Sequence, residues 1–128
     1  MAAELDKRKL AYPPLIEPRI NGNAEVAAGL APVAAVLQRK VYAGTIIAAG
    51  GFDADGAASI VRLGDADLDA SGRLFIANLD LPRRFAMDPP LNAYDRATFY
   101  GGDQRGYADH PSYDATAARA SLQQQGTP

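Results

Sequence analysis

The sequence predicts an α/β fold built on a small parallel sheet. Three apolar stretches bounded by turn-forming residues have the length and composition of strands: residues 10–17, 42–50 and 66–72. Each is followed by a segment with helical spacing of apolar residues, and strand–helix alternation with short connections is typical of parallel sheets. Three parallel strands leave open edges and need cover on both faces. We therefore expect part of a larger fold, or a unit that associates.

The first predicted strand, residues 10–17, contains two prolines, Pro13 and Pro14. Proline has no backbone N–H to donate to a neighbouring strand and is therefore confined to the edges of sheets. We expect this strand at an edge. The helix after it is predicted from apolar residues that recur near helical spacing: Leu30, Val33, Leu37 and Val41.

The second predicted strand, residues 42–50, is followed by a helix with signals at both ends. Asp53 is a favourable N-cap residue, and Gly64 can close the helix in the left-handed conformation. The apolar face between these ends has four members: Ala57, Ile60, Val61 and Leu63.

The third predicted strand, residues 66–72, carries a charged residue, Asp69, in its middle. A buried unpaired carboxylate is costly, so we expect this side chain to be protonated or to reach solvent. In the helix that follows, Leu81 and Phe85 stand at i and i+4, and Asn78 is the expected cap.

Beyond residue 88 the composition changes to turn formers and aromatic residues. Five of the chain's ten aromatic side chains lie here: Tyr94, Phe99, Tyr100, Tyr107 and Tyr113. This composition predicts an ordered loop held by aromatic anchors. Residues 115–128 are predicted to form a weak helix and a frayed tail. The expected organisation is one domain over residues 1–114 followed by that tail.

The composition is that of an ordinary small globular domain and excludes several kinds of site. Of the 128 residues 48% are hydrophobic, and the net charge of −2 gives no electrostatic case for binding nucleic acid or an anionic membrane. The absence of cysteine excludes thiolate chemistry, and the single histidine, His110, cannot build a multi-histidine metal site. No apolar run approaches the length of about 20 residues that spans a bilayer. We expect a soluble, cytoplasmic protein.

Two glycine-bearing strand ends are the candidate functional features. Gly51 follows the second strand, and Gly72 with Arg73 ends the third. In β/α barrels the loops after late consecutive strands commonly form a phosphate site. Glycine lets the backbone N–H groups approach a phosphate, and arginine adds a charge-assisted contact. Gly51, Gly72 and Arg73 therefore have the chemistry of a phosphate site. The alternative is that these glycines only form tight strand-to-helix turns.

Several short sequences, in order along the chain, resemble the old yellow enzyme family, and most closely its 12-oxophytodienoate reductase branch. Residues 44–52 resemble the family's seventh barrel strand, and residues 72–78 resemble the end of its eighth strand and its phosphate helix. Residues 5–7 and 17–19 match the approach to, and the end of, its sixth strand. Four further sequences resemble its C-terminal signature: residues 90–92, 94–96, 98–100 and 106–111.

The resemblance covers about residues 3–114 and implies a partial (β/α)8 TIM barrel, made of the last three β/α units (strands 6–8) plus the C-terminal tail. It also implies an FMN cofactor, NAD(P)H as the reductant and a small α,β-unsaturated carbonyl compound, an enone, as the substrate. By the same resemblance Gly51, Gly72 and Arg73 bind the FMN phosphate.

The resemblance implies two residues on the substrate side. Arg19 would lie at the barrel mouth as a substrate contact, and Tyr100 would line the substrate cavity over the flavin. The alternative role of Arg19 is a surface ion pair, and the alternative role of Tyr100 is a tail anchor.

Two hypotheses about function follow from the resemblance. The family's flavin-ring cradle, carbonyl-binding pair and proton donor come from earlier barrel strands, so we expect no catalytic residue in this chain. The first hypothesis is the FMN-binding portion of an NAD(P)H-dependent ene reductase, inactive as an isolated chain and dependent on a complementing N-terminal chain. The second is a non-catalytic truncated remnant that binds phosphate-bearing ligands or self-associates through its strand edges.

Overall fold

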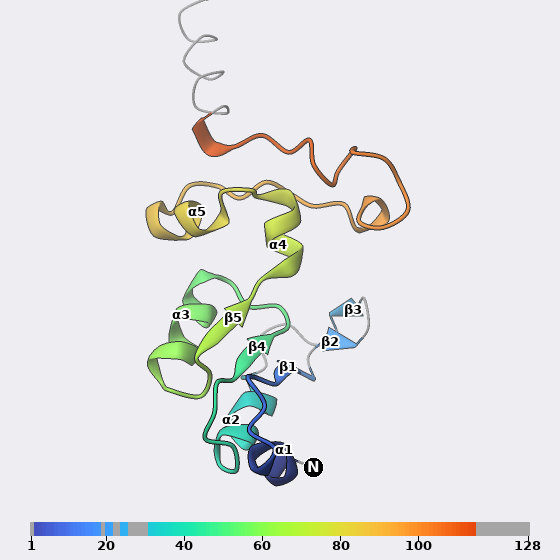
Figure 1. Ribbon diagram of the computed structural model, residues 1–128. Helices are drawn as coiled ribbons and strands as arrows, with labels where there is room; N and C mark the ends of the chain where they lie inside the picture. The colour runs from blue at the N-terminus through green and yellow to red at the C-terminus, as the bar shows by residue number, and fades with distance from the viewer. Residues whose placement is uncertain (1, 19, 22–23, 26–30, 115–128) are drawn as a thin grey trace, which may run out of the picture. The chain divides into compact units, whose positions relative to one another are not determined.

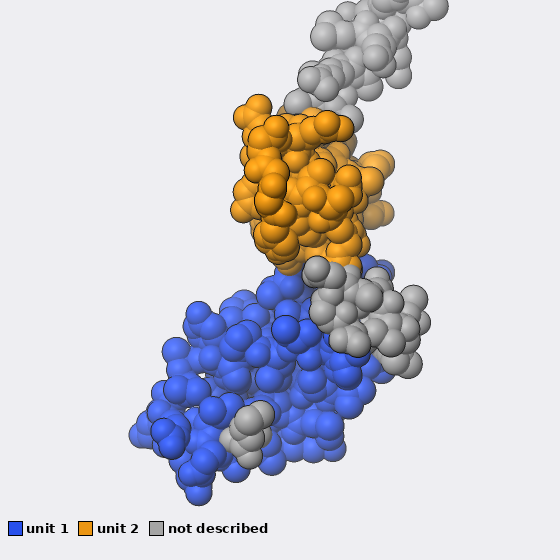
Figure 2. All heavy atoms as spheres, turned by 90° about the vertical axis from the view of Figure 1, so that its right-hand side faces the viewer, with its two compact units in different colours: residues 1–71 blue, residues 72–128 orange. Residues whose placement is uncertain are grey.

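The computed structural model describes residues 2–18, 20–21, 24–25 and 31–114. The chain divides into two compact units, residues 1–71 and 72–128, which Figure 2 draws in different colours. The first unit holds the parallel sheet, and the second holds the helices and the long loop that follow the last strand (Figure 1). The predicted C-terminal helix and tail lie outside the described residues. No helix in the described part has the length and apolar composition needed to cross a membrane.

The sheet of the first unit confirms the prediction of three parallel strands. Its strands are β1 (Pro14–Ile16), β4 (Ile47–Ala49) and β5 (Leu68–Ala70), hydrogen-bonded in that order. Both pairings are parallel, and Leu15, Ala48 and Asp69 lie side by side across the sheet. Each strand is shorter than predicted, because apolar composition continues beyond the residues that form ladder bonds.

β1 is an edge strand of the described sheet, as its prolines predict. The backbone N–H of Ile47 donates to the carbonyl of Pro13 at 3.3 Å, and the N–H of Glu17 donates to the carbonyl of Ala49 at 2.8 Å. Proline keeps its carbonyl acceptor, so it can take part in a ladder where no donor is required.

The other elements of the first unit include two that the sequence did not predict. These are α1 (Ala2–Lys7) and a short antiparallel pair formed by β2 (Ile20–Asn21) and β3 (Ala24–Glu25). Strands of two residues offer too few positions for an alternating pattern to be recognised. The helices predicted after the first and second strands are present as α2 (Ala34–Arg39) and α3 (Ala54–Arg62).

Both predicted ends of α3 are confirmed. The side chain of Asp53 accepts a hydrogen bond from the backbone N–H of Gly56 at 2.8 Å, which satisfies a donor of the first helical turn. Gly64 follows the helix with a φ of +77°, the left-handed conformation expected at this position.

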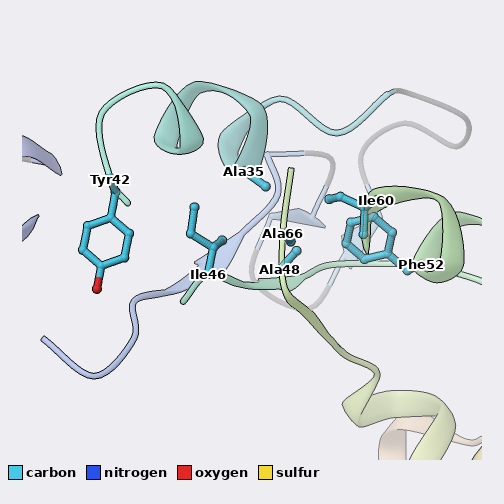
Figure 3. Packing of buried hydrophobic residues seen from close by; sticks show 7 residues of the cluster. All are labelled: Ala35, Tyr42, Ile46, Ala48, Phe52, Ile60 and Ala66. Carbon is cyan, nitrogen blue, oxygen red and sulfur yellow. The ribbon is translucent and has the colours of Figure 1, made fainter. Parts of the chain in front are cut away.

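The core of the first unit lies between the sheet and its helices (Figure 3). It contains seven buried residues: Ala35, Tyr42, Ile46, Ala48, Phe52, Ile60 and Ala66. Along each strand successive side chains point to opposite faces, so the face carrying Leu15 and Ala48 packs into this core. The opposite face, as the register places it, holds six apolar residues: Pro14, Ile16, Ile47, Ala49, Leu68 and Ala70.

The prediction that the apolar stripe of α2 packs against the core is wrong. Val33, Leu37 and Val41 expose 47%, 57% and 49% of their surface, whereas Ala35 is fully buried. Leu30 lies outside the described residues. Alanine has no side chain beyond Cβ, so it lets the helix approach the sheet closely while the larger residues face outwards. Spacing alone could not show which face of the helix meets the sheet.

An ion pair joins α2 to the start of β5. Nη2 of Arg39 lies 2.5 Å from Oδ2 of Asp67, while its Nε and Nη1 donate to the carbonyls of Gly64 (3.0 Å) and Gly44 (2.9 Å). The same carboxylate oxygen accepts from the N–H of Ile46 at 2.7 Å. The hydrogen bond from Ile46, with that from Arg39, lowers the pKa of Asp67 below its usual value.

The second unit contains α4 (Gly72–Ala77), α5 (Leu81–Met87) and the 3-10 helix η1 (Arg96–Thr98). The third strand was predicted to run to residue 72, but it ends at Ala70 and α4 begins at Gly72. A glycine after a strand indicates that the chain turns and does not locate the next helix. Leu81, one of the two apolar residues singled out for this helix, is buried, with 1% of its surface exposed.

Asn78 is not the helix cap that was predicted. The N-cap of α5 is Asp80, and Asn78 is fully buried in a side-chain network. Its Oδ1 accepts from the backbone N–H of Asn92 at 2.8 Å. The side-chain amide of Asn92 donates to the carbonyls of Ala77 and Pro111, both at 2.8 Å. The two asparagines therefore fasten the loop to the end of α4.

Arg84 extends this polar network. Only 3% of it is exposed, and its Nε donates to Oδ1 of Asp80 at 2.7 Å. Its Nη1 and Nη2 donate to the carbonyls of Pro90 (2.5 Å) and Pro111 (3.1 Å). The second oxygen of Asp80 accepts from the N–H of Tyr113 at 2.7 Å. One guanidinium thus holds both ends of the loop against α5.

The prediction that aromatic anchors hold the loop is right in part. Phe99 is buried with 5% of its surface exposed, but Tyr100 and Tyr107 expose 79% and 51%. The loop is also held by the asparagine and arginine network, and most partners in that network are backbone N–H and C=O groups, which leave no mark in the sequence.

Candidate functional site

The carboxyl ends of β4 and β5 carry the two glycine loops that the sequence singled out. The last residues of these strands, Ala49 and Ala70, are paired in the register, so both loops leave the sheet at the same edge. Gly51 is the second residue after β4, and Gly72 is the second after β5. Within the first unit, the two connections therefore begin next to each other.

Two consecutive glycines turn the chain after β4. Gly50 has a φ of +123° and Gly51 a φ of +70°, conformations that residues with a side chain rarely adopt. A Cβ at Gly50 would lie 3.2 Å from both Cβ and the backbone nitrogen of Glu17. The turn itself therefore demands glycine, which supports the alternative structural role. Gly51 is exposed.

Gly72 and Arg73 begin α4 in the second unit. Gly72 is exposed, and a Cβ there would meet nothing within 4 Å. Arg73 is half-buried, with its Nη1 3.5 Å from the hydroxyl of Tyr94 and its guanidinium carbon 5.8 Å from the centre of that ring. The distance to the ring is that of a cation–π contact, which restricts where the guanidinium can lie.

Tyr100 stands at the end of a short row of aromatic rings. The rings of Tyr94 and Phe99 are 5.6 Å apart, and those of Phe99 and Tyr100 are 6.0 Å apart and nearly perpendicular. Buried Phe99 is the anchor of this row, and Tyr100 is the exposed member. Arg73 and Tyr100 are thereby connected within the second unit through two intervening rings. Gly51 belongs to the first unit.

Arg19, the other residue expected on the substrate side, lies outside the described residues. Its neighbour Glu17 is described and has a role that the sequence did not reveal. Glu17 is fully buried, and its carboxylate accepts three backbone N–H bonds from the start of α2. The donors lie 16 to 18 residues away in the sequence, so no local pattern could have connected them.

Asp69 lies half-buried in β5, one residue from the end of the strand. The hydroxyl of Ser71 donates a short hydrogen bond to its Oδ2. The expectation that this carboxyl group is protonated or reaches solvent stays a prediction.

Comparisons with known proteins identify homologues over most of this chain. No family model matches it. Over 116 residues it is 48% identical to 12-oxophytodienoate reductase 1 from Oryza sativa subsp. japonica, which covers 87% of this chain and 29% of the relative. It is 44% identical to 12-oxophytodienoate reductase 2 from Arabidopsis thaliana, over 91% of this chain and 31% of that protein. The chain thus spans about 30% of the length of these relatives.

Solved structures agree with the sequence relatives. Morphinone reductase superposes with a TM-score of 0.73 at 38% identity, over 90% of this chain and 30% of that one. Morphinone reductase in complex with tetrahydroNAD gives a TM-score of 0.72 at the same identity. The fold and the order of sequence features are therefore shared with one part of these larger enzymes.

Proposed function

We propose, from the premise that the homologues of this chain are members of the old yellow enzyme family, that it is the FMN-binding portion of an NAD(P)H-dependent ene reductase. The observation that carries the proposal is the 48% identity to a 12-oxophytodienoate reductase over 87% of the chain. The two glycine loops at one edge of the sheet support it, because they are where a barrel of this family would hold a phosphate. The proposed position is the last three β/α units and the C-terminal tail.

The proposed phosphate contacts are Gly51, Gly72 and Arg73. The first glycine would offer its backbone N–H from the turn after β4, and the second would let a phosphate approach the start of α4. Arg73 would add a charge-assisted contact, with its guanidinium held beside the ring of Tyr94. The exposure of both glycines and the absence of packing around Gly72 fit this role.

The flavin supplies the hydride chemistry when bound, and the protein must orient it and exclude competing reactions. Within this chain, Arg19 and Tyr100 are proposed to face an enone substrate. Tyr100 suits this role because its side chain is exposed while its ring contacts the ring of buried Phe99. These residues bind and position, and the proton and carbonyl contacts are assigned to a complementing N-terminal chain.

The uncovered face of the sheet supports the need for such a chain. Its six residues are all apolar, and Ile16 and Leu68 expose 68% and 53% of their surface. Parallel sheets are normally covered on both faces. We propose that a complementing chain covers this face.

Titration of the purified 128-residue chain with FMN, followed by flavin fluorescence, tests the proposal. We expect saturable binding that Arg73→Ala weakens, because the substitution removes the charged contact. The matched control is Arg62→Ala, an exposed arginine of α3 bonded to Ser59, which should bind as the original chain does. Absence of FMN binding, or an equal loss in both variants, would contradict the proposal.

The second candidate function is the non-catalytic remnant that binds phosphate-bearing ligands. It is favoured by the turn at Gly50 and Gly51, which is explained by backbone geometry without reference to a flavin. Competition separates the two candidates. Inorganic phosphate and ribose phosphate should displace FMN equally well from a phosphate-only site, whereas contacts to the rest of the flavin would make FMN the stronger ligand.

A further inference from the structure

We propose that Glu17 is a positioning residue: its buried carboxylate fixes the turn at Gly50 and Gly51 in the form that binds phosphate. The inference rests on the proposed function, in which Gly51 contacts the phosphate of FMN. Arg19, two residues further along the chain, is proposed to contact the substrate. Glu17 is proposed to contact neither substrate nor phosphate and to act only through the turn.

One side of Glu17 is held by α2. Oε2 accepts the backbone N–H groups of Val33 at 2.7 Å and Ala34 at 3.0 Å, and Oε1 accepts that of Ala35 at 3.0 Å. These donors belong to the first turn of the helix, where no intrahelical acceptor exists. The carboxylate is fully buried, and the three donors compensate the cost of removing it from water. The side chain therefore has one well-defined position.

The other side of Glu17 is held against the glycine turn. Its backbone N–H donates to the carbonyl of Ala49, the last residue of β4, at 2.8 Å. The space where Gly50 would carry a Cβ lies 3.2 Å from Cβ and from the nitrogen of Glu17. The main chain of Gly50 is thus packed directly on Glu17. A shift of Glu17 must be transmitted to the turn, because protein interiors close-pack.

The two sides together make Glu17 a rigid connection between α2 and the turn. Gly50 and Gly51 have no side chains of their own to fix their conformation, and glycine is the most flexible residue. Because Glu17 is fixed by α2, it restricts the conformations of the two glycines before a ligand binds. A preorganised site binds more tightly than a flexible one.

Glu17→Gln tests the inference because it keeps the size of the side chain and changes one acceptor oxygen into an amide donor. The N–H groups of the first turn then lack at least one acceptor, so Glu17 and the turn should shift. In the full 15N-labelled chain we expect the amide signals of Gly50 and Gly51 to move. We also expect the Kd for FMN to rise about tenfold, the size of the loss found when a residue that orients a metal ligand is removed.

Two controls separate positioning from general effects. Glu4→Gln makes the same chemical change at an exposed residue of α1, paired with Lys7 at 3.3 Å. Ile46→Val removes a methyl group from the fully buried core and lowers stability, while the Glu17 carboxylate and its three backbone donors are kept. Both should leave the glycine signals and the Kd for FMN unchanged. Equal changes in Ile46→Val would mean that Glu17 acts only through stability, and the inference would be overturned.

The remaining outcomes are also decisive. Unmoved glycine signals and an unchanged Kd in Glu17→Gln would overturn the inference. Where that variant does not fold, Glu17→Asp keeps the charge on a side chain one methylene shorter, and an intermediate shift is expected; no shift would overturn the inference. Where the original chain does not bind FMN, the proposed function fails, and the glycine signals alone decide whether Glu17 positions the turn.

Discussion

The two adjacent arginines of α5 differ in how much they contribute to the stability of the second unit. Arg84 is buried and bonds Asp80, Pro90 and Pro111, whereas Arg83 is half-exposed and pairs with Asp114 at 2.5 Å. We expect Arg84→Lys to destabilise the second unit by at least about 2 kcal/mol. The lysine ammonium cannot reach three acceptors in a fixed fork, and charge-assisted hydrogen bonds contribute about 1.5–3 kcal/mol each.

Hydrogen exchange of the Asn92 amide measures this effect, because that N–H donates to Asn78 inside the same network. Exchange should accelerate strongly in Arg84→Lys. The matched control, Arg83→Lys, should leave it almost unchanged, since an exposed ion pair contributes little. Similar exchange in the two variants would show that the loop does not depend on the Arg84 fork.

Asp80 links the stability of the second unit to pH. The hydrogen bond from Arg84, with that from the Tyr113 N–H, lowers the pKa of this carboxyl below its usual value. A lowered pKa in the folded state gives stability that is present above the ordinary value of about 4 and is lost as the pH falls through the folded-state pKa. The difference in urea midpoint between the original chain and Asp80→Asn should therefore be largest above pH 4 and shrink towards pH 2. A difference that is constant with pH would contradict the assignment.

At the scale of single elements, the end of α3 depends on backbone conformation alone. Gly64 has a φ of +77°, and a Cβ there would meet nothing within 4 Å. We expect Gly64→Ala to destabilise the chain by about 1–2 kcal/mol, the cost of the left-handed conformation for a residue with a side chain. Thermal denaturation measures the change.

Gly72→Ala is the control for this prediction, because Gly72 also has open space around it and its φ is outside the left-handed range. Its stability should be unchanged or slightly raised, since alanine favours the helix that begins there. A loss equal to that of Gly64→Ala would mean that packing, and not backbone conformation, decides both positions.

At the scale of the whole molecule, the proposed division of labour predicts an inactive chain. The residues assigned here bind phosphate or face the substrate, while catalysis requires flavin, carbonyl donors and proton source in one geometry. With excess FMN, NADPH and 2-cyclohexenone, the 128-residue chain should consume NADPH no faster than free FMN does. Turnover well above that rate, abolished in Arg73→Ala, would show that association of copies rebuilds a working site.

The sequence by itself determined the features that depend on neighbouring residues. Three parallel strands with helices between them, the Asp53 cap and the Gly64 end of α3 were all predicted and are present. A helix N-cap and a left-handed glycine at the end of a helix both depend on residues within about four positions of each other. The alternation of apolar stretches is likewise visible along the sequence. The edge position of β1 followed from its prolines for the same reason.

The tertiary structure alone decided which surfaces meet and which polar groups are buried. The outward position of Val33 and Leu37, the burial of Glu17 against α2 and the network of Asn78 with Asn92 were not predicted. Each depends on partners more than ten residues away, and most of those partners are backbone N–H and C=O groups, which every residue carries. A group common to all residues leaves no sequence pattern, so only the folded chain shows which of them a buried side chain will bind.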